Sequence, residues 1–203
     1  MNEYKIKFIH KRERKMDKKN ELLAAAREVF AEKGYKAAGI SDIAKRSQMA
    51  VGSFYKYYES KEAIFLEVYI AENSRIREET MRRVDWQGEP EAIVEQLFAV
   101  TFELISPNKI LAEWNKPGIS QILHDYYNQD AGRASNAFHQ FLIQTFSQRL
   151  QEEGFSKEKI AEIMKVYDLI YYIDMHVTEQ EFSGYFDSFE TLVKYFVKGI
   201  FSK

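Results

Sequence analysis

Residues 34–65 read GYKAAGISDIAKRSQMAVGSFYKYYESKEAIF and contain two short helical patterns that follow each other closely. The first pattern runs from about Ile40 to Ser47, and the second from about Val51 to Tyr58. The second is rich in tyrosine, serine and lysine rather than in core residues. Such side chains seek phosphates and base edges, so the pattern predicts a short helix that enters a DNA groove.

The apolar positions around these patterns predict a three-helix packing. A preceding helix from about Asp17 to Gly34 carries apolar residues at intervals of three and four, namely Leu22, Ala25, Ala26, Val29 and Phe30. The inner face of the second helix is formed by Ile40, Ile43 and Ala44. Because Phe54 and Tyr58 are four residues apart, they share one face and are predicted to anchor the third helix.

The opposite face of the third helix is predicted to contact DNA. Its hydroxyl and ammonium groups can donate to phosphates, and Gly52 allows close approach of the backbone. Val51 predicts an apolar contact with a thymine methyl group. The full predicted set of DNA contacts is Ser41, Lys45, Val51, Gly52, Ser53, Tyr55, Lys56, Tyr57 and Lys61.

Residues 17–65 resemble the DNA-binding domain of the TetR family of bacterial transcription regulators. The resemblance is carried by the apolar stripe of the first helix, by Gly34-Tyr35, by Asp42-Ile43-Ala44 and by GSFYxYYxSKE over residues 52–62. It implies phosphate contacts at Ser53, Tyr57 and Lys61, and base-edge or groove-floor contacts at Val51, Gly52 and Tyr55. It also implies a homodimer on a palindromic DNA operator and a small-molecule pocket in the C-terminal domain.

Three positions depart from the pattern that this family usually shows. Gly39 stands where the family usually has threonine, so the second helix lacks a side-chain cap. Gln48 stands where a turn glycine is usual, and a left-handed conformation there would carry strain of about 1 kcal/mol. Ala50 replaces a serine cap worth about 1 kcal/mol. We expect these departures to affect the boundary of the third helix more than the fold.

Composition limits the other functions that the chain can have. Hydrophobic residues make up 45% of 203 residues, which favours a packed core, and the absence of cysteine excludes disulfides and cysteine-based zinc or iron–sulfur sites. No stretch approaches the roughly 20 apolar residues of a membrane span, and we expect a cytoplasmic protein. Residues 1–62 carry 15 Lys/Arg against 9 Asp/Glu, whereas residues 63–203 carry 14 against 22. This asymmetry indicates a nucleic-acid-binding end on a separate body.

Helical periodicity dominates the whole chain, which predicts an all-α fold with an N-terminal three-helix helix-turn-helix domain and a C-terminal helical domain for ligand binding and dimerisation. The predicted division is a flexible basic arm over 1–15, the DNA-binding domain over 16–62 and the C-terminal domain over 63–203. Beyond the third helix, we expect helices that cover about 61–83, 91–105, 108–115, 118–129, 131–153, 156–178 and 185–201.

The last two predicted helices have the character of a dimer interface. The final helix has an unbroken apolar face, and the helix before it is apolar on two sides, so one side can face a partner. A monomer whose own neighbours cover both sides remains the alternative. The predicted interface residues are Ile163, Tyr167, Ile170, Phe189, Leu192, Val193, Phe196, Val197 and Ile200.

Residues 86–203 hold 20 of the 30 aromatic residues, which favours a cavity for a hydrophobic or aromatic ligand. Ordinary core packing is the alternative role for each of them. The predicted lining is Phe98, Phe102, Trp114, Tyr126, Tyr127, Phe138, Phe141, Tyr171 and Met175. Asp174 and Glu103 are candidates for pairing with a cationic ligand.

The sequence contains no pattern that indicates catalysis. The four histidines are scattered, and there is no phosphate-binding glycine loop or nucleophile motif, so we expect no enzyme, no metal site and no cofactor. The expected function is a ligand-responsive repressor that binds double-stranded DNA as a dimer and is released by a small effector. A ligand-independent DNA-binding or DNA-organising protein, and a helical small-molecule-binding domain without DNA binding, remain the alternatives.

Overall fold

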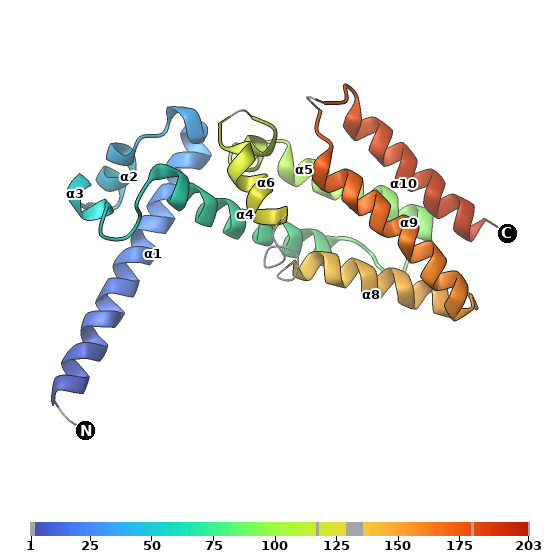
Figure 1. Cartoon of the computed structure of the whole chain (residues 1–203), viewed down its shortest axis with the longest axis horizontal. Coiled ribbons are helices and arrows are strands. Elements are labelled where there is room, and N and C mark those ends of the chain that lie inside the picture. The colour runs from blue at the N-terminus through green and yellow to red at the C-terminus, as the bar shows by residue number, and fades with distance from the viewer. Residues whose placement is uncertain (1–2, 117, 129–135, 180, 203) are drawn as a thin grey trace. The chain divides into compact units, whose positions relative to one another are not determined.

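The computed structural model describes residues 3–116, 118–128, 136–179 and 181–202, with side chains from Met16 onward except at positions 115 and 128. Every regular element in these ranges is a helix, which confirms the predicted fold class (Figure 1). The elements are α1 (Glu3–Ala37), α2 (Ile40–Arg46), α3 (Val51–Phe54), α4 (Lys61–Arg83), α5 (Pro90–Ile105), the 3-10 helix η1 (Leu111–Asn115), α6 (Ser120–Asn128), α8 (Ala137–Glu152), α9 (Lys157–His176) and α10 (Tyr185–Phe201).

The chain forms two compact units. Unit 1 consists of residues 1–74 together with Asn108–Glu113, and unit 2 consists of Arg75–Pro107 and Trp114–Lys203. Helix α4 runs through the boundary, so its first part belongs to unit 1 and its last part to unit 2. No helix in the described ranges is both long enough and apolar enough to cross a membrane.

The core of unit 1 is an aromatic and aliphatic cluster built from α1 to α4. The predicted apolar stripe of α1 is buried, and so are Ile43 and Ala44 of α2 and Phe54 of α3. The Phe30 ring meets Phe65 of α4 edge-on at a centroid distance of 4.9 Å. Each large apolar side chain buried in this way contributes about 1.5–3 kcal/mol.

Helix α1 begins earlier than the sequence predicted. Its backbone is helical from Glu3, whereas a flexible arm was expected over residues 1–15. Residues 3–15 contain neither glycine nor proline and are rich in lysine, arginine and glutamate, whose helix propensity is high, so the packed part of α1 can extend through them. The predicted stop at Gly34 is confirmed, because this residue leaves helical geometry with φ 74° and ψ 172°.

The turn between α2 and α3 contains two of the three residues that depart from the usual family pattern. Gln48 takes φ 56°, the left-handed conformation that usually favours glycine. Ala50 precedes α3 without a side-chain cap. Helix α3 ends at Phe54, four residues before the predicted end, and the chain turns so that the buried Tyr58 donates its backbone N–H to the Phe54 carbonyl at 3.1 Å.

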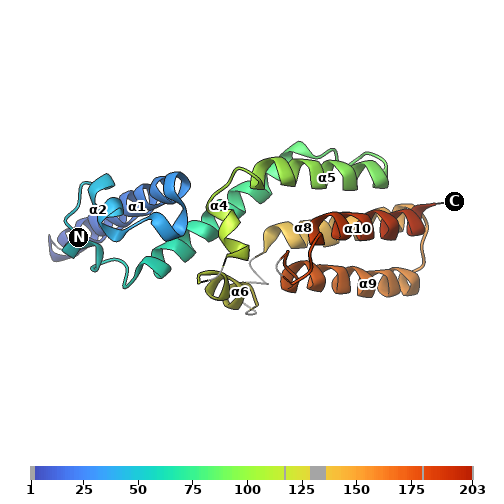
Figure 2. The same ribbon diagram turned by 90° about the horizontal axis from the view of Figure 1, so that it is seen from above.

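Unit 2 is built around two helix pairs. Helix α5 packs against α10, and α8 packs against α9 (Figure 2). The first pair joins through Phe98 and Phe189, whose ring centroids lie 6.1 Å apart, and the second through Phe146 and Tyr167 at 5.9 Å. The sequence predicted a helix from about residue 131, but residues 129–135 lie outside the described ranges, and α8 begins after Asn136.

Replacing the strained turn residue should stabilise unit 1. We expect Gln48→Gly to raise the free energy of unfolding by up to about 1 kcal/mol, because glycine adopts φ 56° without the Cβ clash. Hydrogen exchange of the amides of α1 to α4 measures this change. Gln48→Ala is the control and should give no such gain, since alanine keeps the clash; equal effects of the two substitutions would contradict the explanation.

Candidate nucleic-acid interface

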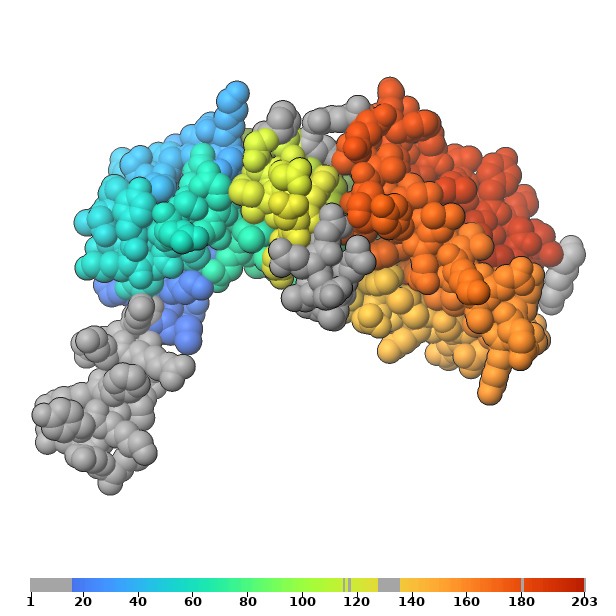
Figure 3. Space-filling model, viewed as in Figure 1, coloured from blue at the N-terminus to red at the C-terminus, as the bar shows by residue number. Residues whose placement is uncertain are grey.

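The segment from Val51 to Tyr57 is held to unit 1 from one side and exposed on the other. The Phe54 ring is fully buried and packs against Tyr58 at a centroid distance of 6.0 Å. On the outer side Val51 is 46% exposed and Tyr55 is 57% exposed. Figure 3 shows this segment on the surface of unit 1. We call Val51–Tyr57 the recognition segment.

The other predicted DNA contacts in this unit differ in accessibility. Ser41, Lys45 and Lys56 are exposed, and so is Gly52, around which a Cβ atom would meet no neighbour within 4 Å. Ser53 and Tyr57 are half-buried. Lys61, at the start of α4, is half-buried as well.

A network of ion pairs fixes α2 against α1. Arg46 contacts the carboxylates of Glu28 at 2.9 Å and Glu32 at 2.8 Å. Lys33 pairs with Asp42 at 2.9 Å, and Asp42 also accepts the Gly39 backbone N–H at 3.0 Å. The hydrogen bond from Lys33, followed by that from Gly39, lowers the pKa of Asp42. Exposed pairs contribute only about 0–1 kcal/mol each, so their main effect is to orient α2.

Lys61 serves the fold rather than the exposed surface. Its ammonium donates to the carbonyl oxygens of Tyr35 and Ala38, each at 3.0 Å, and lies 4.2 Å from the centre of the Tyr35 ring. It thereby satisfies carbonyl groups that the end of α1 leaves without helical partners. The resemblance implied that Lys61 contacts a phosphate; in this structure the same ammonium is engaged within unit 1.

Three residues that the sequence did not single out make contacts within unit 1, and two of them, Lys19 and Glu67, lie beside the recognition segment. Lys19 and the Tyr58 hydroxyl both donate to Glu67, at 2.9 Å and 3.0 Å. Glu113 is buried and accepts the Tyr35 backbone N–H at 3.2 Å. These residues are distant in sequence from their partners, and no local pattern indicates such pairings.

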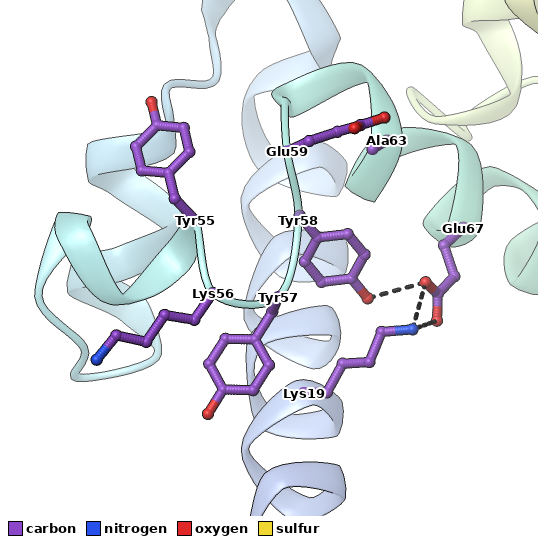
Figure 4. A pocket seen from close by; sticks show the side chains of 8 residues that line it. All are labelled: Lys19, Tyr55, Lys56, Tyr57, Tyr58, Glu59, Ala63 and Glu67. Carbon is purple, nitrogen blue, oxygen red and sulfur yellow. Dashed lines mark hydrogen bonds and ion pairs between the residues drawn. The ribbon is translucent and has the colours of Figure 1, made fainter.

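A shallow depression opens beside the recognition segment, with a volume of about 440 Å³ (Figure 4). Helix α1 contributes Lys19 to its wall, and α4 contributes Ala63 and Glu67. The remaining wall is the turn between α3 and α4. The lining from that turn is Tyr55, Lys56, Tyr57, Tyr58 and Glu59.

The predicted ligand residues of unit 2 lie in several aromatic clusters. Phe98 packs on Phe189, Phe141 packs on Trp86 at 4.8 Å, and Tyr171 stacks on His139 at 3.7 Å. The remaining contacts are Trp114 with His124 and Tyr127, Tyr126 with Tyr127, and Phe138 with Arg77.

Two of the predicted ligand residues stand apart from these clusters. Phe102 is 70% exposed on α5, and Met175 is half-buried. The two acidic candidates also differ. Glu103 pairs with Arg83 at 2.6 Å, whereas Asp174 contacts only the Tyr185 hydroxyl, at 3.5 Å, among the contacts that the structure resolves for it.

The predicted dimer residues fall mainly on the inner faces of α9 and α10. Ile163, Ile170 and Val197 are buried within unit 2, while Leu192 is exposed. The rest are half-buried, namely Tyr167, Phe189, Val193, Phe196 and Ile200. A second set of apolar residues is exposed on these helices, formed by Val166, Leu169 and Tyr172 of α9 and Phe186 and Tyr195 of α10. The sequence showed that α9 is apolar on two sides but did not show which side is inner.

Comparison with known proteins gives a family match for unit 1. Residues 22–68 match the family described as "Bacterial regulatory proteins, tetR family". YdgC, an uncharacterized HTH-type transcriptional regulator of Bacillus subtilis, is 38% identical over 65 residues, which are 32% of this chain and 33% of that protein. QacR, an HTH-type transcriptional regulator of Staphylococcus aureus, is 34% identical over 64 residues, or 32% and 34% of the two chains. The matched segment thus spans about a third of these relatives.

Solved structures resemble the chain over most of its length. A protein from Mesorhizobium loti assigned to the TetR family shares 20% identity and a TM-score of 0.52, over 91% of this chain and 95% of that one. A TetR-like transcriptional regulator from Rhodococcus sp. RHA1 shares 18% identity and a TM-score of 0.50, over 92% and 97%. At this identity the likeness concerns the fold.

Removal of the Lys61 ammonium should destabilise unit 1. We expect Lys61→Met to lower its free energy of unfolding by about 1 kcal/mol, because the half-buried carbonyls of Tyr35 and Ala38 lose a charged donor. Hydrogen exchange at the end of α1 and the start of α4 measures the loss. Lys56→Met is the matched control and should leave stability unchanged. Unaltered exchange in Lys61→Met would show that the ammonium does not support the fold.

The family match and the geometry concern the same residues. The matched range begins with the buried Leu22 of α1 and ends at the buried Val68 of α4, and it includes the whole recognition segment. The described helices outside this range adopt the fold of proteins assigned to the same family. Residues 22–68 therefore belong to the tetR family of bacterial regulatory proteins.

Proposed function

We propose that this chain is a ligand-responsive repressor that binds a palindromic DNA operator as a homodimer and releases it when a small hydrophobic or aromatic effector binds. The observation that carries the proposal is the recognition segment, which is anchored by the buried Phe54 and presents Val51, Tyr55 and Lys56 to solvent. A short helix anchored on one side and exposed on the other can enter the major groove without rearrangement of the domain.

The two kinds of group on this segment have different proposed roles. Lys56 and the hydroxyl groups of Ser53 and Tyr57 contact phosphates and set the position on the duplex. Val51 and Tyr55, with the open backbone at Gly52, contact base edges, where an apolar group favours a thymine methyl. Ser41 and Lys45 of α2 add further phosphate contacts.

The proposed dimer uses the outer faces of α9 and α10. Val166, Leu169 and Tyr172 of α9 and Leu192 and Tyr195 of α10 expose apolar surface that a second copy would cover. A two-fold axis through this surface makes one self-complementary interface. The same axis relates two recognition segments, which is why the operator is proposed to be palindromic.

The proposed effector binds among the aromatic clusters of unit 2, where Phe98, Tyr127, Phe138 and Tyr171 offer apolar rings beside polar groups such as the Arg77 guanidinium. The effector would release DNA by favouring a dimer whose recognition segments no longer match the groove spacing. A coupling free energy of about 1–3 kcal/mol gives a 5- to 150-fold change in affinity. Helix α4, which is continuous through both units, is proposed to transmit the effect of the effector from unit 2 to unit 1.

In vitro selection from a randomised duplex library with the full chain tests DNA binding. We expect a palindromic duplex to be recovered, and Val51→Lys to change the selected bases because its apolar contact is lost. Lys56→Gln should instead weaken binding to every duplex alike, because it removes a phosphate contact. Band-shift assays at low salt measure both effects.

The same assay separates the functional alternatives. Release of the selected duplex by a fraction of a cell metabolite extract supports the effector. Retention in every fraction would favour ligand-independent DNA binding, and no recovered duplex at low salt would overturn the DNA-binding function.

A charge in the proposed interface should separate the two copies. We expect the wild-type chain to have the mass of a dimer in light scattering and Leu169→Glu to have that of a monomer, because the carboxylate would lose its hydration in an apolar contact. Phe102→Glu changes another exposed apolar residue, on α5, and should remain dimeric. A monomeric wild type, or dissociation by the control alone, would contradict this interface.

A further inference from the structure

The depression beside the recognition segment is continuous with the proposed DNA-binding surface, because Tyr55 and Lys56 belong to both. Its far wall is Lys19 of α1, a residue outside the predicted DNA contacts. Figure 4 shows the Lys19 side chain extending from α1 toward Glu67 of α4, whereas the Lys56 side chain points the other way, on the far side of Tyr57. Any group bound there would therefore touch the recognition segment and the first helix together.

The donors around this depression suit an anion. Within the part of the chain that the structure describes, neither the Lys56 ammonium nor the Tyr57 hydroxyl has a hydrogen-bond partner. Lys19 adds a second ammonium. Lysine and tyrosine side chains of this kind are common donors to DNA phosphates. The Glu59 side chain extends toward Ala63 and away from the Lys56 ammonium (Figure 4).

In the free protein Glu67 forms an ion pair with the Lys19 ammonium. Its two oxygens lie 3.0 Å and 2.9 Å from Lys19, and one of them also accepts the Tyr58 hydroxyl at 3.0 Å. The side chains of Lys19 and Glu67 are 37% and 40% exposed. At such exposure an ion pair contributes little to stability, so an incoming phosphate can replace the carboxylate with little loss.

We propose that this depression holds a phosphate of the DNA backbone, and that Lys19 exchanges Glu67 for that phosphate when duplex binds. The proposal rests on the proposed DNA-binding function and extends the contact surface from the recognition segment to α1. In the free protein Glu67 keeps Lys19 in place, while Tyr58 stays bonded to Glu67 in both states.

The salt dependence of binding to the selected duplex tests this assignment. Loss of one phosphate contact reduces the slope of log affinity against log salt by about one. We expect this reduction, with a several-fold weaker affinity and unchanged base preference, for Lys19→Gln. The neighbouring exposed Lys18 on the same helix provides the control, and Lys18→Gln should keep the wild-type slope. A wild-type slope in Lys19→Gln overturns the phosphate site.

A second variant separates contact with phosphate from support of the fold. Glu67→Gln keeps an acceptor for Tyr58 but releases Lys19, so we expect several-fold tighter binding of the duplex. In this background Lys19→Gln should still reduce the slope by about one. If the effect of Lys19→Gln disappears when Glu67 is changed, Lys19 acts only by holding Glu67, and the proposal is wrong.

Titration with inorganic phosphate distinguishes a DNA phosphate from a free anion. Backbone amide signals of residues 56–59 should move when duplex is added and stay unchanged at millimolar phosphate. Movement with phosphate, together with an unaltered slope in Lys19→Gln, would assign the depression to a free anion and overturn the proposal. A wild-type slope in Lys19→Gln with normal operator binding would overturn the phosphate site but leave the proposed function intact. Failure to recover any duplex would overturn both the phosphate site and the proposed function.

Discussion

The packing of Phe30 against Phe65 is the contact on which the arrangement of unit 1 depends. It joins α1 to α4 at a centroid distance of 4.9 Å, and the Tyr35 ring lies 4.8 Å from Phe65 and 6.2 Å from Phe30. Because Tyr35 follows the bend at Gly34, this cluster fixes where α1 ends and therefore where α2 begins. The exposed recognition segment can be rigid because the core beneath it is closed by aromatic contacts.

Several charged residues around this core form hydrogen bonds that stabilise unit 1. Lys61 satisfies carbonyl oxygens at the end of α1, and Tyr35 donates its hydroxyl to Glu62. Burial and the hydrogen bond to Glu62 raise the pKa of Tyr35, so its hydroxyl stays protonated and remains a donor. Half-buried charged groups such as Lys61 thus hold helices of unit 1 together, whereas Lys56 is exposed.

The sequence predicted those features that follow from local spacing. Phe54 and Tyr58 are both buried as predicted, although α3 ends at Phe54 and Tyr58 is held by a backbone hydrogen bond to Phe54 in the following turn. The stop at Gly34 follows from the freedom of glycine at positive φ. The predicted start of α1 was wrong because charged residues of high helix propensity before Asp17 were interpreted as a flexible arm.

Other features require tertiary knowledge that periodicity does not contain. Apolar residues on both sides of α9 predicted two contacts, yet only the packing of Tyr167 against Phe146 identifies the inner side. The ion pair of Lys19 with Glu67 joins residues 48 positions apart, and no local sequence pattern predicts it. Most of the predicted DNA contacts are exposed because these positions alternate with the apolar positions that form the core.

The discontinuity of unit 1 has a consequence for the order in which the nascent chain folds. Ile110 and Leu111 are buried, Asn108 donates to the buried Glu72 at 2.8 Å, and Glu113 accepts from Tyr35, so residues 108–113 complete unit 1. These residues leave the ribosome only after all of α5 has been made, although domains generally fold as units from the N-terminus during synthesis. Most of unit 1 is therefore translated before α5, but the unit is completed only after α5 has emerged.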